Sequence, residues 1–215
     1  VPAFQDLLYS AEEVARQGYL VTLGITPTYA ATGYGYIQRG ELVVHLDKQM
    51  AYRVVRFKEK PNEATALELL KSGDHDWNSG MFIWQVSQIL DEFAQHMPDL
   101  SHQLEEISHS WVSTEQQTVL RTVWPQIKAQ TIDYGIMEKA NRVAVLPAGS
   151  LGWNDVGSWE SLFDVVQANR DGNILMDVNH LGIDTERSLV CADHTGRLIV
   201  TIGVQDLVIV DTDDA

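Results

Sequence analysis

The sequence predicts an α/β protein, and three observations lead to this class. Apolar residues repeat at helical spacing over 4–15, and a nearly continuous apolar run follows at 19–25. Such a run is typical of a strand buried on both faces, and a helix before it favours a parallel α/β layer. Residues 98–127 show helical spacing alone, and short apolar runs separated by turn residues follow position 169. We therefore expect an α/β sheet with a helical insert and a short β-rich C-terminal tail.

Glycine and proline mark the ends of the elements expected before the insert. Gly18 ends the first helix, Pro61 ends a strand because proline has no backbone N–H to donate, and Gly73 ends the next helix. The expected elements are, in order, a helix over 4–15, strands over 19–25, 36–44 and 54–60, a helix over 62–70, a strand over 79–84 and a helix over 87–97.

The second half of the chain changes from helices to short strands. We expect, in order, two or three helices over 98–127, a helix over 133–140, a strand over 143–146, a helix over 158–168 and strands over 189–192, 198–202 and 207–210. The turn-forming run Asp193-His194-Thr195-Gly196 predicts a hairpin between two of these strands. Because the pattern changes near Asn169–Gly172, we expect two domains, 1–170 and 171–215.

Composition and charge exclude two classes of partner. The formal net charge is −15 at pH 7, which repels polyanions, so we expect no nucleic-acid partner. No apolar run is long enough to span a membrane, so we expect no membrane partner. The single cysteine, Cys191, cannot form an internal disulfide and indicates a cytoplasmic protein.

Two charged stretches leave alternatives open. Arg53, Arg56, Lys58 and Lys60 have the spacing of one strand face, which is either solvated or able to attract one small anion. The run Asp-His-Asp at 74–76 contains metal-ligating residue types. Adjacent residues seldom converge on one ion, so we expect a solvated loop there rather than a metal site.

Several short motifs supply the chemistry of a sugar-phosphate site. In the run 32–36, two glycines flank Tyr34, so Gly35 lets the backbone approach a ligand closely; the alternative is a plain turn into a strand. Glu59 and Lys60 end a strand and should point to opposite sides, one toward hydroxyl groups and the other toward a phosphate. The alternative for this pair is an exposed ion pair before a proline turn.

Two further residues have a functional and a plain interpretation. Asn78 offers two amide donors and an acceptor oxygen that suit sugar hydroxyls, although Asn78-Ser79-Gly80 is also a good turn. Asp155 precedes the helix expected over 158–168, so it is either a first-turn carboxylate that complements the helix dipole or a Mg²⁺ ligand.

Six motifs occur together in the order typical of one family. They lie at residues 24–28, 32–36, 57–61, 77–82, 132–139 and 152–159. In this order they closely resemble the bacterial mannose-1-phosphate guanylyltransferases, also called GDP-mannose pyrophosphorylases, from about residue 4 to residue 215. The resemblance implies a Rossmann-like nucleotide-diphospho-sugar transferase sheet. It also implies a reaction in which mannose-1-phosphate and GTP give GDP-mannose and pyrophosphate.

The resemblance implies a role for each candidate residue. Tyr34 and Gly35 would line the sugar site. Glu59 and Asn78 would bind mannose hydroxyls, and Lys60 would neutralise the sugar phosphate. Transfer of this kind depends on positioning and charge neutralisation, which a lysine and a metal ion provide.

The departure from the family concerns the nucleotide half. The family's Gly-rich basic loop, its guanine-reading residues and its first metal-binding Asp would all lie before Val1. The resemblance therefore implies an N-terminally truncated sheet, with Asp155 as one of two Mg²⁺ ligands and GTP binding only if an upstream segment is present. We expect the 215-residue chain alone to be inactive. Its tail from Gly182 resembles the start of the family's C-terminal β domain.

The alternative function is a non-catalytic sugar-phosphate-binding or assembly module derived from such an enzyme. Loss of the first strands would expose a sheet edge and apolar surface, which a homodimer would cover. We therefore expect a homodimer. The sequence leaves open the base, the sugar and whether the gene encodes further segments.

Overall fold

The computed structural model describes residues 2–46, 49–149, 151–193 and 196–215. The chain divides into two compact units, residues 1–151 and residues 152–215. This division falls before the change of sequence pattern near Asn169–Gly172. Within the described ranges, no helix is both long and apolar enough to cross a membrane.

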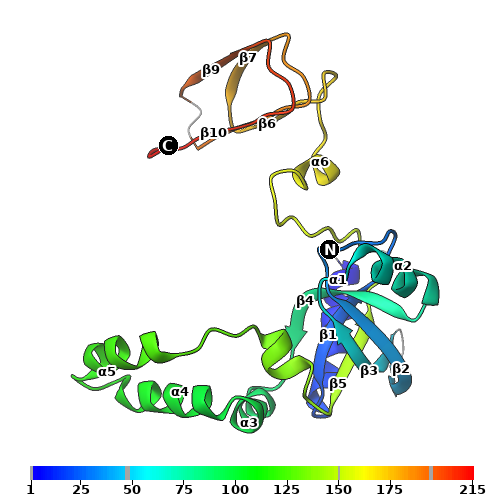
Figure 1. Ribbon diagram of the computed structural model, residues 1–215, viewed down its shortest axis with the longest axis vertical. Helices are drawn as coiled ribbons and strands as arrows, with labels where there is room; N and C mark the ends of the chain where they lie inside the picture. The colour runs from blue at the N-terminus through cyan, green and yellow to red at the C-terminus, as the bar shows by residue number, and fades with distance from the viewer. Residues whose placement is uncertain (1, 47–48, 150, 194–195) are drawn as a thin grey trace. The chain divides into compact units, whose positions relative to one another are not determined.

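The first unit contains a mixed sheet of five strands that closes on itself (Figure 1). The strands are β1 (Leu20–Ile25), β2 (Tyr36–His45), β3 (Met50–Lys58), β4 (His75–Ile83) and β5 (Val143–Pro147). Their order is β1-β4-β2-β3-β5, and β5 pairs in parallel with β1 and antiparallel with β3. The α/β class is confirmed. The expected parallel layer is limited to the β1–β5 pair, and the expected open edge is absent from the described sheet because β3 and β5 pair.

The helices of the first unit follow the sequence signals closely. They are α1 (Pro2–Arg16), α2 (Glu63–Ser72), α3 (Val86–His96), α4 (Pro98–Ser110) and α5 (Gln116–Val123), with a short 3₁₀ turn η1 (Trp124–Gln126) and a π-helical turn η2 (Asp133–Met137). The side chain of Asn62 caps α2 by accepting a hydrogen bond from the Thr65 amide at 2.9 Å. Gly73 ends α2 with a φ of 73°.

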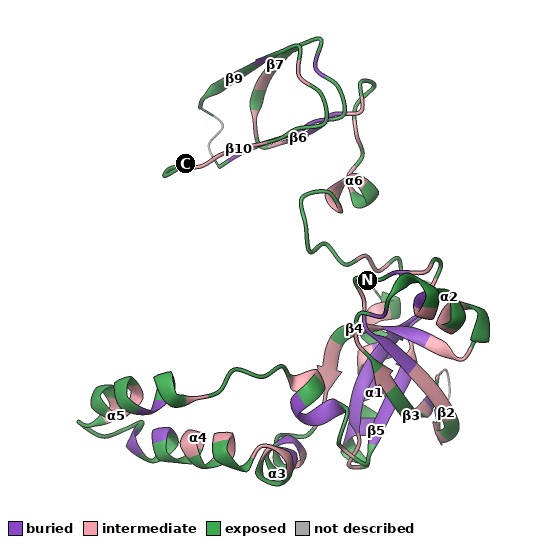
Figure 2. Cartoon of the chain, in the orientation of Figure 1, coloured by how far each residue is buried: buried purple, intermediate pink, exposed green. Residues whose placement is uncertain are grey.

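The core of the first unit joins the sheet to α3 and η2. Leu20, Ile89, Ile136, Met137 and Val143 form one buried cluster. The buried residues of this unit gather in the strands and the inner faces of α1 and η2, whereas α4 and α5 are largely exposed (Figure 2). The predicted all-helical insert over 98–127 is therefore confirmed as a pair of peripheral helices.

The second unit is built from short parallel strands. They are β6 (Ile174–Met176), β7 (Asn179–Ile183), β8 (Leu189–Ala192), β9 (Leu198–Ile202) and β10 (Val208–Asp211), after a four-residue helix α6 (Leu162–Val165). The chain alternates between two sheets, one ordered β10-β8-β6 and the other formed by β7 and β9, and every pairing is parallel. This is the geometry of a coil that winds like a β-helix.

Four local predictions were wrong. The hairpin expected at 193–196 would pair β8 with β9, but these strands belong to different sheets; His194 and Thr195 themselves lie outside the described residues. The helix expected over 158–168 is only α6, and the helix expected over 133–140 is only η2. In the loop expected at 74–76, His75 and Asp76 instead begin β4, and Asp76 is 1% exposed.

Candidate functional site

Gly35 lies at the point where three predicted site residues meet. It precedes β2, and its carbonyl oxygen accepts a hydrogen bond from the backbone N–H of Asn78 at 2.7 Å. A Cβ on Gly35 would overlap Glu59 Oε2 and would lie 3.5 Å from Asn78 Cβ. Only glycine fits this position without displacing the carboxylate. The structure therefore brings Gly35, Glu59 and Asn78 together.

Tyr34 is held beside this point by an aromatic cluster. Its ring packs edge-on against Trp77 with a centroid distance of 5.0 Å, and Tyr29 packs against the same indole at 5.0 Å. The hydroxyls of Tyr29 and Tyr34 are 3.3 Å apart. Offset and edge-on contacts of this kind fix ring orientation, so Tyr34 forms a defined wall next to Gly35.

The amide of Asn78 is oriented from both of its ends. Thr22 Oγ1 donates to Asn78 Oδ1 at 3.1 Å, and Asn78 Nδ2 donates to Asp133 Oδ1 at 2.9 Å. Asn78 lies within β4 rather than in a turn, and it is opposite Gly24, where the pairing of β1 with β4 is irregular. Asp133 was not assigned a role from the sequence, although it lies in the motif at 132–139.

Glu59 and Lys60 do not point to opposite sides, contrary to the sequence prediction. Strand β3 ends at Lys58, and Lys60 has a φ of 42°, which is not a strand conformation. As a result, Lys60 Nζ lies 3.9 Å from Glu59 Oε1. The Lys60 side chain is 67% exposed and that of Glu59 is 24% exposed. Lys60 is therefore a flexible cation beside a largely covered carboxylate.

The surroundings of Glu59 oppose its ionisation. Burial raises the pKa of Glu59 above its ordinary value, and the nearby carboxylates of Asp133 and Glu138 raise it further, while Lys60 partly offsets them. Hydroxyl groups that donate hydrogen bonds to this carboxylate would replace the hydration that it has lost. Glu59 is therefore well placed to bind a polyol.

A hollow of about 420 Å³ opens beside Glu59, and we call it the Glu59 hollow. It is lined by Val55, Arg56, Phe57, Lys58, Glu59, Tyr134 and Glu138. Its wall combines carboxylates and a phenol, which suit hydroxyl groups, with two cations, which suit a phosphate. This combination is consistent with a ligand that carries both.

Asp155 lies in the second unit, whereas the other candidates lie in the first. It is exposed, and its carbonyl accepts a hydrogen bond from the Gly157 amide at 2.9 Å. The residues around it have no helical structure, so Asp155 is not a first-turn carboxylate. Its carboxylate makes no hydrogen bond or ion pair among the described residues.

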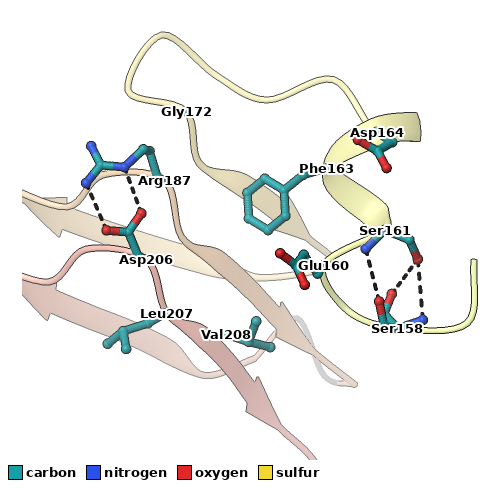
Figure 3. Close-up of a pocket in the computed structure, with 10 residues that line it drawn as sticks. All are labelled: Ser158, Glu160, Ser161, Phe163, Asp164, Gly172, Arg187, Asp206, Leu207 and Val208. Atoms are coloured by element: carbon teal, nitrogen blue, oxygen red, sulfur yellow. Dashed lines mark hydrogen bonds and ion pairs between the residues drawn. The ribbon is translucent and has the colours of Figure 1, made fainter. Parts of the chain in front are cut away.

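The second unit also contains a hollow of about 780 Å³, shown in Figure 3. Figure 3 shows the Arg187 guanidinium facing the Asp206 carboxylate, with Nε and Nη2 donating at 2.7 and 2.9 Å. The other lining residues with charge are Glu160 and Asp164. The cation of this hollow is thus already neutralised, and the hollow does not suit a phosphate. The candidate sugar-phosphate site is the one in the first unit.

Comparisons with known proteins agree with the fold and the motifs. The nucleotidyl transferase family model matches residues 2–172, and the model of the MannoseP isomerase/GMP-like beta-helix domain matches residues 178–215. The chain therefore belongs to the nucleotidyl transferase family. The parallel coil of β6 to β10 lies largely within the second match.

Individual relatives carry specific names. Mannose-1-phosphate guanylyltransferase 2 of Escherichia coli O157:H7 is 38% identical over 99% of this chain and 44% of its own length. The mannose-1-phosphate guanylyltransferase RfbM of Salmonella typhimurium is 38% identical over 99% of this chain and 43% of its own length. A crystal structure described as mannose-1-phosphate geranyltransferase from Thermus thermophilus superposes with a TM-score of 0.75 and 31% identity, covering 100% of this chain and 59% of that one. The chain thus spans less than half the length of the two named guanylyltransferases of Escherichia coli and Salmonella.

Proposed function

We propose that this chain provides the sugar-phosphate site of a mannose-1-phosphate guanylyltransferase, which makes GDP-mannose and pyrophosphate from mannose-1-phosphate and GTP. The observation that carries the proposal is the meeting of Gly35, Glu59 and Asn78 beside the Glu59 hollow. The names of the relatives support the choice of substrate.

In this proposal Glu59 and Asn78 bind the hexose hydroxyls. The amide of Asn78 is fixed by its two side-chain partners, so it loses little conformational freedom on binding. Gly35 leaves the space that the Glu59 carboxylate occupies, and Tyr34 forms the wall beside it. These groups discriminate between sugars because a sugar that leaves one of them buried without a hydrogen-bond partner loses binding free energy.

Lys60 neutralises the sugar phosphate. It is a compact ammonium on a flexible stem and lies beside the sugar-binding carboxylate. The positive charge of Lys60 also stabilises the negative charge that develops on the α-phosphate of GTP during transfer.

Mg²⁺ is the proposed cofactor, and Asp155 would hold it. The chemistry of the donor fits, because Mg²⁺ is bound through one or two carboxylates together with water and substrate phosphate oxygens, and Asp155 is an exposed carboxylate without a protein partner among the described residues. When bound, the ion would offset negative charge on the phosphates. Asp155 supplies one carboxylate oxygen donor to that ion.

The remaining parts of the proposal concern partners and location. The 215 residues contain no Gly-rich basic loop, so we propose that GTP binds only with an upstream segment and that this polypeptide alone does not turn over. We propose a homodimer, supported by exposed apolar side chains on the β7–β9 sheet, among them Ile183 and Ile202. The free thiol of Cys191 and the net charge of −15 support a cytoplasmic protein without a nucleic-acid partner.

Calorimetric titration with mannose-1-phosphate tests the site. We expect saturable binding that Glu59→Gln and Lys60→Ala each weaken by about tenfold or more, since each removes a charged hydrogen bond. Lys71→Ala, on the exposed last turn of α2, is the matched control and should bind normally. Absence of binding by the unmodified chain, or equal loss in the control, would overturn the proposal.

A guanylyl-transfer assay separates the catalytic question from the binding question. Purified chain is incubated with GTP, Mg²⁺ and mannose-1-phosphate, and release of pyrophosphate is measured. We expect no turnover above background even where mannose-1-phosphate binds. Robust turnover by this polypeptide would show that the nucleotide site does not need a Gly-rich loop. Binding without turnover would also fit the alternative of a sugar-phosphate-binding module.

A further inference from the structure

A second hollow of about 420 Å³ lies on the side of the sheet next to α2, and we call it the α2 hollow. Its lining residues come from β2, β3, β4 and α2; they are Gln38, Arg56, Lys58, Thr65, Leu69 and His75. None of these residues is acidic, although the chain as a whole has a net charge of −15. The hollow is therefore a local concentration of basic groups on an acidic protein.

The two cations of the α2 hollow have no protein partner in the described part of the chain. Arg56 and Lys58 are two residues apart on β3 and are exposed. The neighbouring Arg53, by contrast, is paired with Glu41 at 3.4 Å. Arg56 and Lys58 are thus free to bind an external anion. This favours the anion-attracting interpretation of the basic row over the purely solvated one.

His75 contributes a buried imidazole whose orientation is fixed. Its side chain is only 9% exposed, and its Nδ1 lies 2.7 Å from Asp74 Oδ1. Hydrogen bonds from Ser72 and Gln38, together with His75, hold the pKa of Asp74 well below its ordinary value, so this oxygen is a carboxylate acceptor. Two acceptors would repel at this distance, so Nδ1 carries a hydrogen and donates it.

The other nitrogen of His75 is the one that remains available. Nε2 has no hydrogen-bond partner among the residues that the structure describes, and the ring forms part of the wall of the α2 hollow. Nε2 donates to an anion when the ring carries a hydrogen there as well as on Nδ1. The negative charge of Asp74 is meanwhile spread over its own hydrogen bonds to Gln38 and His75.

We propose that the α2 hollow binds a phosphate-class oxyanion at a site separate from the sugar-phosphate site. The Arg56 guanidinium and the Lys58 ammonium supply the charge, and His75 Nε2 and the Thr65 hydroxyl supply directed hydrogen bonds. The ligand is inorganic phosphate, pyrophosphate or the phosphate group of a small ester, all of which present the same oxygens. The α2 hollow shares Arg56 and Lys58 with the Glu59 hollow, whereas His75 and Thr65 line the α2 hollow and not the Glu59 hollow, so these two residues distinguish the sites.

Nuclear magnetic resonance of the histidine side chains tests this proposal. The ¹⁵N-labelled chain is titrated with inorganic phosphate, and then separately with pyrophosphate and mannose-1-phosphate, at constant ionic strength set with chloride. The seven histidines give separate imidazole signals, and the signal lost in His75→Gln identifies His75. We expect a saturable shift of the His75 signal with half-saturation at about 1 mM or below.

Variants at exposed positions identify the groups that bind. Arg56→Gln and Lys58→Gln should each weaken the His75 response by about tenfold, the value of one charged hydrogen bond. Arg53→Gln on the same strand and Lys71→Gln on α2 remove the same charge outside the hollow and should leave the response unchanged. All four side chains are exposed, so these variants should fold.

Three outcomes would overturn the proposal. The first is a His75 signal that does not shift, or that shifts in proportion to phosphate without saturation. The second is equal weakening by the control variants, which would show a general charge effect. The third is loss of the phosphate response in Glu59→Gln, which would mean that the anion occupies the Glu59 hollow instead. If the sugar-phosphate proposal alone fails, the calorimetric titration with mannose-1-phosphate shows no binding heat, while the His75 signal still shifts with inorganic phosphate.

Discussion

Asp76 is a buried carboxyl group whose ionisation should reduce the stability of the first unit. It is 1% exposed in β4, and Arg39 Nε lies 3.3 Å from its Oδ2 without a well-formed hydrogen bond. A Cβ on Gly24 would approach Asp76 Oδ2 to 2.8 Å, so the carboxylate is closely packed. Burial raises the pKa of Asp76 from 3.8 to about 6, although Arg39 partly opposes the effect.

The sign of the resulting pH dependence follows from proton linkage. Between the unfolded and folded pKa values the folded chain holds one more proton at Asp76, so stability falls as pH rises. A pKa raised from 3.8 to about 6 contributes about 3 kcal/mol to the free energy of unfolding. This contribution is fully present below the pKa of the unfolded state and is lost as pH rises through the pKa of the folded state. About 1.4 kcal/mol of this is lost between pH 5 and pH 8.

Asp76→Asn removes this titration while keeping the size of the side chain. We expect the wild-type chain to lose about 1.4 kcal/mol relative to Asp76→Asn between pH 5 and pH 8. Urea unfolding followed by circular dichroism, at several pH values in this range, measures both free energies of unfolding. The comparison is between two chains because other carboxyl groups also titrate. A difference that is independent of pH, or that increases with pH in favour of the wild type, would refute the assigned environment of Asp76.

Four further predictions address the caps, the sites and the second unit. Asn62→Ala removes the cap of α2 and should cost about 1 kcal/mol in urea unfolding, whereas Asn62→Ser should restore most of it. Gly35→Ala should abolish calorimetric binding of mannose-1-phosphate with the circular dichroism spectrum retained, because its Cβ displaces Glu59; normal binding would contradict the close approach. The pKa of Glu59 is raised and bound hydroxyls favour its ionised form, so the affinity for mannose-1-phosphate should fall as pH decreases through that pKa. In Glu59→Gln, the affinity should change with pH only through the titration of the phosphate itself. Thr201→Val removes a buried hydroxyl 2.7 Å from Thr185 Oγ1 and should lower the stability of the second unit by about 1–3 kcal/mol in thermal unfolding; an unchanged transition would show that this contact contributes nothing.

The parts of the fold that could be predicted are those with local physical signals. Asn62 and Gly73 bound α2 because each provides something that the helix end itself needs, an acceptor for a free amide and a left-handed conformation. The strand at 19–25 was predicted because both of its faces are covered, which leaves no polar position to confuse the pattern. Such signals act within a few residues and do not depend on the rest of the chain.

The tail shows where local signals stop. The strands at 189–192, 198–202 and 207–210 were identified and β6 and β7 were not. A parallel coil and a series of hairpins use the same strand residues and the same turn residues. What distinguishes them is which strand lies beside which. The partner of Leu189 is Ile174 on one side and Val208 on the other, and no neighbouring residue in the sequence reveals this. The hairpin prediction failed for that reason.

The candidate site divides in the same way, and Asp133 explains why. Gly35, Glu59 and Asn78 were identified because each lies in a motif that resembles the guanylyltransferase family. Asp133 acts only through Asn78 and Glu59. It accepts a hydrogen bond from the side-chain amide of Asn78, which is 55 residues away in the sequence, and its charge raises the pKa of Glu59. Both effects arise where η2 packs beside β4 and the end of β3, which is a property of the assembled core. The Asp133 carboxylate thus orients the amide of Asn78 and makes Glu59 more dependent on hydrogen-bond donors from a ligand. The two sugar-binding groups are therefore coupled through a residue that need not contact the sugar.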